Sequence, residues 1–255
     1  MPRPDVSNTY GDVDRSADPD EAAAWMDRVA TYPGIAESKE RALALLAGCE
    51  RVLDLGCGLG NDVRAMGEGA VGVDPSRTML AEARRRGGRF VLAHGQALPF
   101  RDGSFDGARA DRVLQHVVGP EAVTAELVRV AAAGAPVVVT DPDQATLVID
   151  GPDPELTAAV VQFRKEGIRN PFLAGRMVEV LGVAGCDDVV SERYTEIVGE
   201  VPLAFGLASW SGAMVEAGRF DAGQAAAFDA SLSAADDDGR FAYRVDLVVT
   251  HGRKR

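Results

Sequence analysis

The sequence contains few cysteines, histidines and aromatic residues. Its 255 residues include three cysteines, three histidines, and 6% Phe, Trp and Tyr. Cys49, Cys57 and Cys186 are widely spaced and form no CxxC pair, so the pattern supports neither a disulfide framework nor a zinc site. We therefore expect free thiols in a reducing compartment and no bound metal.

Long apolar runs and an excess of positive charge are also missing. No window approaches the roughly 20 apolar residues that cross a bilayer, and no apolar run follows the first charged residues as in a secretory signal. We therefore expect a cytoplasmic protein without a membrane partner. The formal net charge is -12, and such a negative field repels a phosphate backbone, so no nucleic-acid partner is expected.

The composition is otherwise that of a folded protein, with 46% hydrophobic and 26% charged residues. Residues 1–18 are polar and without periodicity, which predicts a flexible arm, whereas residues 19–255 are long enough for one large domain. Apolar runs alternate with amphipathic stretches, which predicts an α/β fold with a mostly parallel sheet and helices on both faces. The expected strands are residues 51–55, 70–73, 89–93, 105–110 and 135–140, and the helices between them are 61–66, 76–86 and 120–132.

Helical segments outside this alternating core predict a lid. Residues 19–48 carry apolar residues at helical spacing before the first strand. Four prolines punctuate residues 142–171, so this stretch is expected to be an insertion, and residues 200–237 are expected to form a second, helical one. The remaining expected elements are helices 21–32, 36–46, 155–166 and 173–184 and strands 188–197 and 241–250.

A glycine-rich loop follows the first expected strand, as Asp54-Leu-Gly-Cys-Gly-Leu-Gly60. Glycines let a backbone turn tightly and approach a ligand, although a purely structural turn is the alternative. The dinucleotide-binding fingerprint would need a glycine where Asn61 stands, so that version is not matched. Asp74 ends the second strand, where a carboxylate can bind ribose hydroxyls or, alternatively, cap the next helix.

Together, the glycine loop and Val71-Gly-Val-Asp74 resemble the first two cofactor motifs of class I S-adenosylmethionine-dependent methyltransferases. Leu98-Pro-Phe-Arg-Asp-Gly-Ser-Phe-Asp106 is similar to a segment of the ubiquinone/menaquinone-biosynthesis-type enzymes of this class. The resemblance covers roughly residues 52–140 and implies a Rossmann-like, seven-stranded sheet with an antiparallel last strand. Three further pieces follow the pattern of the same family: Val113-Leu-Gln-His116, Glu126-Leu-Val-Arg-Val130 and Gly134.

The resemblance also implies S-adenosyl-L-methionine as cofactor, with S-adenosyl-L-homocysteine as product. Asp54 and the backbone at Gly56 and Gly58 would hold the methionine portion, and Asp74 the ribose. Pro75 and Met79 would pack against adenine. The family has an Asp-Ala pair where this chain has His94 and Gly95, and a neutral imidazole can still accept a hydrogen bond from adenine. The expected cofactor-binding set is Asp54, Gly56, Cys57, Gly58, Asp74, Pro75, Met79, His94, Gly95, Gln96, Asp111 and Arg112.

Two polar residues beyond the fourth and fifth strands are candidates for catalysis. His116 and Asp141 lie at the edge of an open α/β sheet where ligands bind. In related sugar and natural-product methyltransferases a His and an Asp at similar places act on a substrate hydroxyl. We therefore expect His116 as general base and Asp141 as its orienter, the alternatives being a packed histidine and a turn aspartate.

The acceptor is expected to be a small molecule, hydrophobic or of natural-product type, with O-methylation favoured and a place in secondary metabolism. After Asp111 and Arg112 the chain lacks both the prolines and aromatic of adenine methyltransferases and the Pro-Cys of cytosine enzymes. The alternatives are a protein of the same fold catalysing another reaction, such as a cyclisation, and a nucleotide-binding oxidoreductase. A homodimer is left open. Seven residues outside the sheet could form an apolar roof over the acceptor or simply pack the helices: Trp25, Tyr32, Phe163, Phe172, Phe205, Trp210 and Met214.

Overall fold

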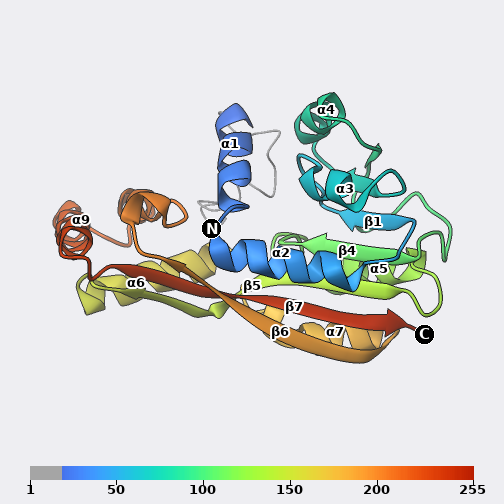
Figure 1. Cartoon of the computed structure of the whole chain (residues 1–255). Coiled ribbons are helices and arrows are strands. Elements are labelled where there is room, and N and C mark those ends of the chain that lie inside the picture. The colour runs from blue at the N-terminus through green and yellow to red at the C-terminus, as the bar shows by residue number, and fades with distance from the viewer. Residues whose placement is uncertain (1–18) are drawn as a thin grey trace.

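A seven-stranded sheet in the order β3-β2-β1-β4-β5-β7-β6 runs through the computed structural model, which describes residues 19–255 (Figure 1). The pairs from β3 to β5 are parallel, and β7 lies antiparallel between β5 and β6. This arrangement confirms the expected fold class. The arm expected at residues 1–18 lies outside the described residues. The strands are β1 Val52–Leu55, β2 Val71–Asp74, β3 Phe90–Leu92, β4 Gly107–Asp111, β5 Pro136–Asp150, β6 Cys186–Val198 and β7 Ala242–Lys254.

Helices cover both faces of this sheet, as the strand alternation predicts. Within residues 19–255 no helix has both the length and the apolar character needed to cross a bilayer. The helices are α1 Pro19–Val29, α2 Pro33–Leu45, α3 Asn61–Met66, α4 Arg77–Arg85, α5 Pro120–Val130, α6 Pro154–Gly167, α7 Met177–Ala184, α8 Trp210–Glu216 and α9 Ala222–Asp237, with 3-10 turns η3 Ala174–Arg176, η4 Val201–Leu203 and η5 Leu207–Ser209.

The first core forms where alternate residues of the central strands face opposite layers. Val137 and Val139 of β5 pack in the cluster that includes residues of α5 and α7, whereas Val138 packs with Ala42 and Leu46 from α2 and its end. Successive side chains of a strand point to opposite faces, so an unbroken apolar strand must be covered on both. The central strands are therefore buried between two helical layers.

The fifth strand is longer than the sequence indicates, because the strand expected at residues 135–140 continues into the stretch expected as an insertion. β5 continues to Asp150, and its pairing with β7 contains a bulge between Asp143 and Val148. Pairing with β4 ends at Thr140, so beyond that residue β5 has β7 as its only neighbouring strand among residues 19–255. A proline is tolerated on such an edge because its missing N–H breaks no ladder bond.

A second core lies where β5 and β7 extend beyond the parallel strands. There α6, α8 and α9 pack around the strand ends, and Figure 1 shows α6 and α9 gathered at that end of the sheet. Phe205 is in edge contact with Trp25 and Tyr32, and its ring centroid is 5.1 Å from that of Tyr243. Six of the seven expected roof residues join this core, but Phe172 is 53% exposed.

Candidate cofactor and acceptor site

The glycine loop is fixed to the end of β2. The amides of Gly56 and Cys57 donate to the carbonyl of Val73 at 2.7 and 3.1 Å. Gly56 has a φ of 70°, and a Cβ at this position would overlap the side chain of Val113. The position therefore requires glycine both for its left-handed backbone and for the close approach of the segment after β4.

Asp74 lies at the carboxyl end of β2 and faces the same loop. One carboxylate oxygen accepts from the amide of Gly58 at 2.9 Å and the other from the amide of Ser76 at 2.8 Å. A carboxylate offers about four acceptor positions, and these two bonds use one position on each oxygen. A Cβ at Gly58 would lie 2.7 Å from Cε of Met26 in α1, so the loop leaves little room for a side chain there.

A buried arginine joins the glycine-loop strand to β4, and the sequence interpretation missed it. Arg109 is 1% exposed, and its guanidinium lies 3.6 Å from Asp54, 3.0 Å from Asp62 and 2.9 Å from Asp111. Burial raises the pKa of the Asp54 carboxyl, while the charge of Arg109 acts in the opposite direction. The sequence feature that could have revealed Arg109 is a single cationic residue between two alanines in a central strand.

Lysine 39 of α2 completes this group of buried charges. Lys39 lies 2.6 Å from Asp62 and 3.5 Å from Asp111. Burial alone would raise the pKa of Asp111, but the charges of Arg112, Lys39 and Arg109 together hold it below its ordinary value. Asp111 is therefore an ionised carboxylate whose charge is already matched by cations of the protein.

The residues expected to contact adenine come from two loops and from α4. Pro75 and His94 are exposed, whereas Met79 is buried in a small cluster with Leu59 and Met26. A Cβ at Gly95 would lie 2.8 Å from Val123, so this glycine is set by packing against α5. Pro75 and His94 thus offer exposed surface from the two loops, whereas Met79 of α4 is packed against its neighbours. The remaining member of the set, Gln96, donates its side-chain amide to the carbonyl of Val118 at 3.0 Å.

His116 lies in the turn after β4, surrounded by positive charge. Burial, together with the charges of Arg164, Arg112 and Arg169, lowers the pKa of its imidazole to about 4. The side chain of Arg169 donates to the backbone carbonyl of His116 at 3.2 Å, and Asn170 donates to the carbonyls on either side of it, holding the turn in place. The imidazole is consequently neutral near pH 7.

Asp141 is 1% exposed at the point where β5 leaves β4. Its carboxylate oxygens make no hydrogen bond of regular geometry within residues 19–255, although the backbone amides of Gln115 and Leu114 lie beside them. Burial raises its pKa well above the ordinary value; the backbone amide of Gln115, the largest opposing influence, lowers it. No hydrogen bond joins Asp141 to His116, so the structure brings the two residues to one edge of the sheet but does not pair them.

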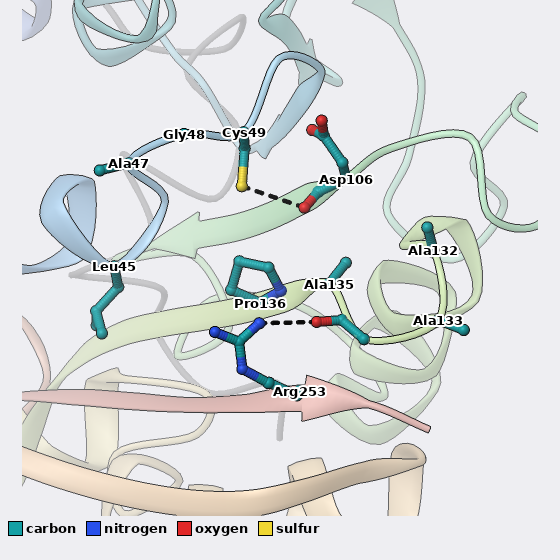
Figure 2. Close-up of a pocket in the computed structure, with 11 residues that line it drawn as sticks. Leu45, Ala47, Gly48, Cys49, Asp106, Ala132, Ala133, Ala135, Pro136 and Arg253 are labelled. Atoms are coloured by element: carbon teal, nitrogen blue, oxygen red, sulfur yellow. Dashed lines mark hydrogen bonds between the residues drawn. The ribbon is translucent and has the colours of Figure 1, made fainter.

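A separate hollow of about 370 Å³ lies at the opposite, amino-terminal edge of the strands (Figure 2). It is bordered by Cys49, whose thiol donates to the carbonyl of Asp106, and by Arg253, which donates to the carbonyl of Gly134. Ligands of open α/β sheets bind outside the carboxyl ends of the strands. The glycine loop, Asp74 and His116 all belong to that other edge.

The sheet order, the glycine loop after β1 and the acidic end of β2 are the features of the class I S-adenosylmethionine-dependent methyltransferase fold. S-adenosylmethionine fits the site because the buried carboxylate of Asp74 lies beside Gly56 and Gly58, where any side chain would take up the space of the loop. Residues 53–139 match the family model described as a methyltransferase domain. That match spans the glycine loop, Asp74 and His116.

Two curated proteins are similar to this chain in sequence. An uncharacterized 37.1 kDa protein in a transposon of Streptomyces fradiae is 36% identical over 191 residues, which cover 70% of this chain and 55% of the relative. A demethylmenaquinone methyltransferase of Clavibacter sepedonicus is 36% identical over 155 residues, which cover 55% of this chain and 62% of the relative. The chain thus spans less than two thirds of the length of these curated relatives.

A solved structure shows the same fold. Phosphoethanolamine N-methyltransferase 2 of Haemonchus contortus, in complex with phosphomonomethylethanolamine and S-adenosylhomocysteine, matches with a TM-score of 0.60 at 17% identity. The alignment covers 96% of this chain and 60% of that chain. At this level of identity the comparison shows the fold alone.

Proposed function

We propose that the protein transfers a methyl group from S-adenosylmethionine to a small-molecule acceptor. The observation that carries the proposal is the hydrogen bond between Asp74 and Gly58, which joins the carboxylate proposed to bind ribose to the glycine loop. In this proposal Asp54, Gly56 and Gly58 hold the methionine portion. The other cofactor contacts proposed are Cys57, Asp74, Pro75, Met79, His94, Gly95, Gln96 and Asp111.

The proposed reaction is O-methylation of an acceptor with an apolar body. S-adenosylmethionine supplies a methyl group on a sulfonium, and the protein must align a nucleophile with it. The neutral imidazole of His116 can accept the proton of an acceptor hydroxyl at the carboxyl edge of the sheet. Asp141 lacks the bond that would orient His116, so we propose that it contacts the acceptor instead. The apolar body would pack against the aromatic second core, where the side chains of Trp210 and Arg164 meet.

Binding and turnover assays test the proposal separately. Calorimetry with S-adenosylhomocysteine should show binding, and Asp74→Ala should weaken it. Incubation with S-adenosylmethionine and a panel of hydroxylated aromatic acids should release S-adenosylhomocysteine. Binding without any released S-adenosylhomocysteine, even with acceptors that are chemically altered, would favour a non-methylating reaction in the same fold.

A further inference from the structure

Three arginines from separate segments gather around His116. Arg112 follows β4, Arg164 lies in α6, and Arg169 follows α6. All three act on the imidazole by charge, and no carboxylate is among the charged groups that act on it within the described part of the chain. This local excess of positive charge occurs in a chain whose net charge is -12, which makes it a feature of the site and not of the composition.

In the described part of the chain, Arg112 shares its one carboxylate partner with other cations, and Arg169 has none. The nearest carboxylate to Arg112 is Asp111, at 3.4 Å, and Asp111 is already paired with Arg109 and Lys39. The Nε atom of Arg112 is buried and has no hydrogen-bond partner among residues 19–255. Across the same residues, Arg169 bonds to a backbone carbonyl and makes no ion pair.

The backbone of Arg112 is held in a strained conformation that sets its position. Arg112 has a φ of 58°, which residues with a side chain rarely adopt. Its amide donates to the carbonyl of Thr140 at 2.6 Å, which ties it to β5 next to Asp141. Such strain persists where the surrounding structure fixes it, and it is concentrated at ligand sites. The charge of Arg112 acts on both the carboxyl of Asp141 and the imidazole of His116.

We propose that the methyl acceptor carries a carboxylate or phosphate group that binds to Arg112 and Arg169 beside His116. The planar guanidinium fork matches both oxyanions. Arg112 was expected in the cofactor set, and this proposal assigns it to the acceptor. Because a bound anion offsets the charge of the arginines, it also increases the affinity of His116 for the proton that the acceptor releases. The inference rests on the proposed function, since it specifies the acceptor of that reaction.

Three probes with one ring test the anion site: phenyl phosphate, benzoate and benzyl alcohol, titrated by calorimetry with S-adenosylhomocysteine present. The anions should bind at least tenfold more tightly than the alcohol, and the tighter of the two names the group. Arg169→Gln and Arg112→Asn should each weaken anion binding by about tenfold to a hundredfold, as expected for charge-assisted bonds. Asparagine tolerates the left-handed backbone at position 112.

A matched control and a second readout keep the result interpretable. Arg176→Gln alters an exposed arginine paired with Glu179 and should leave anion binding unchanged. In nuclear magnetic resonance titrations, phenyl phosphate should raise the pKa of His116 by about one unit or more. Equal binding of anion and alcohol, or an unmoved imidazole, overturns the inference. Repeating the anion titrations without S-adenosylhomocysteine separates the anion site from the proposed function. If the anions bind but S-adenosylhomocysteine does not, the result counts against the proposed function alone.

Discussion

The carboxylate of Asp74 and the amide of Gly58 are joined by a hydrogen bond of 2.9 Å, so the end of β2 and the glycine loop form one unit. Asp74→Ala removes this bond and the charged acceptor for the ribose hydroxyls. Cofactor binding should weaken by about 1.5 to 3 kcal/mol, the usual value of hydrogen bonds to a charged group. Calorimetry with S-adenosylhomocysteine measures the change, and Asp187→Ala on β6, whose side chain is exposed, is the control. Unchanged affinity would contradict the assignment of this pocket.

His116→Ala should leave cofactor binding nearly unchanged and lower the single-turnover rate by about 10² to 10⁴, the range for a lost acid-base group. Since the pKa of His116 is about 4 in the free protein, the imidazole is already unprotonated at pH 5. The pH profile of kcat/KM should therefore show no acid limb from this residue between pH 5 and 8. A limb near pH 6.5 that disappears in the variant would contradict the low pKa.

Asp141→Asn should stabilise the protein at neutral pH. The pKa of the Asp141 carboxyl is raised above its ordinary value of 3.8, so folding favours the protonated form. Its contribution to stability is complete below that ordinary value and is lost as the pH rises toward the folded pKa. The amide cannot ionise, so thermal melts should coincide near pH 4 and separate in favour of the variant at higher pH. If the wild type and the variant melt at the same temperature as each other both at pH 4 and at pH 8, Asp141 ionises without a cost to stability.

Arg109→Met should destabilise the fold by about 3 to 5 kcal/mol, because it leaves the carboxylates around it buried without their main partner. Urea unfolding measures the loss. Lys39→Met removes a cation from the same group at a site nearer the surface and should cost less. A loss below about 1 kcal/mol for Arg109→Met would mean that the carboxylates protonate instead, and the stability of the variant would then fall as the pH rises above their ordinary pKa values.

The sequence predicts those parts of the molecule that are fixed by residues close together in the chain. The glycine loop and Asp74 follow from the chain within a single strand, turn and strand, and both lie where expected. The group around Arg109 depends on Lys39 and Asp62 from two different helices, and no local pattern reports such a contact. The strand beyond Pro142 is missed for a related reason, since the edge that makes a proline acceptable exists only once β4 has ended.

The candidate catalytic pair illustrates a second limit. The positions of His116 and Asp141 after two adjacent strands are readable from the sequence, because carboxyl ends of parallel strands meet at one edge. The directions of the side chains are not. Arg169 and Asn170, which follow α6, hold the turn that carries His116, and that contact spans more than fifty residues of chain.

The continuous pairing of β5 with β7 has an evolutionary consequence. Each of these two strands runs from the central part of the sheet to the second core without a connecting loop. The helices α6, α8 and α9 therefore pack at the ends of the same two strands that lie away from the central sheet. If the second core receives the acceptor, as proposed, substitutions among those helices change the surroundings of the acceptor while the strands beside the glycine loop keep their neighbours. One donor half can in this way be inherited unchanged by enzymes whose acceptors diverge.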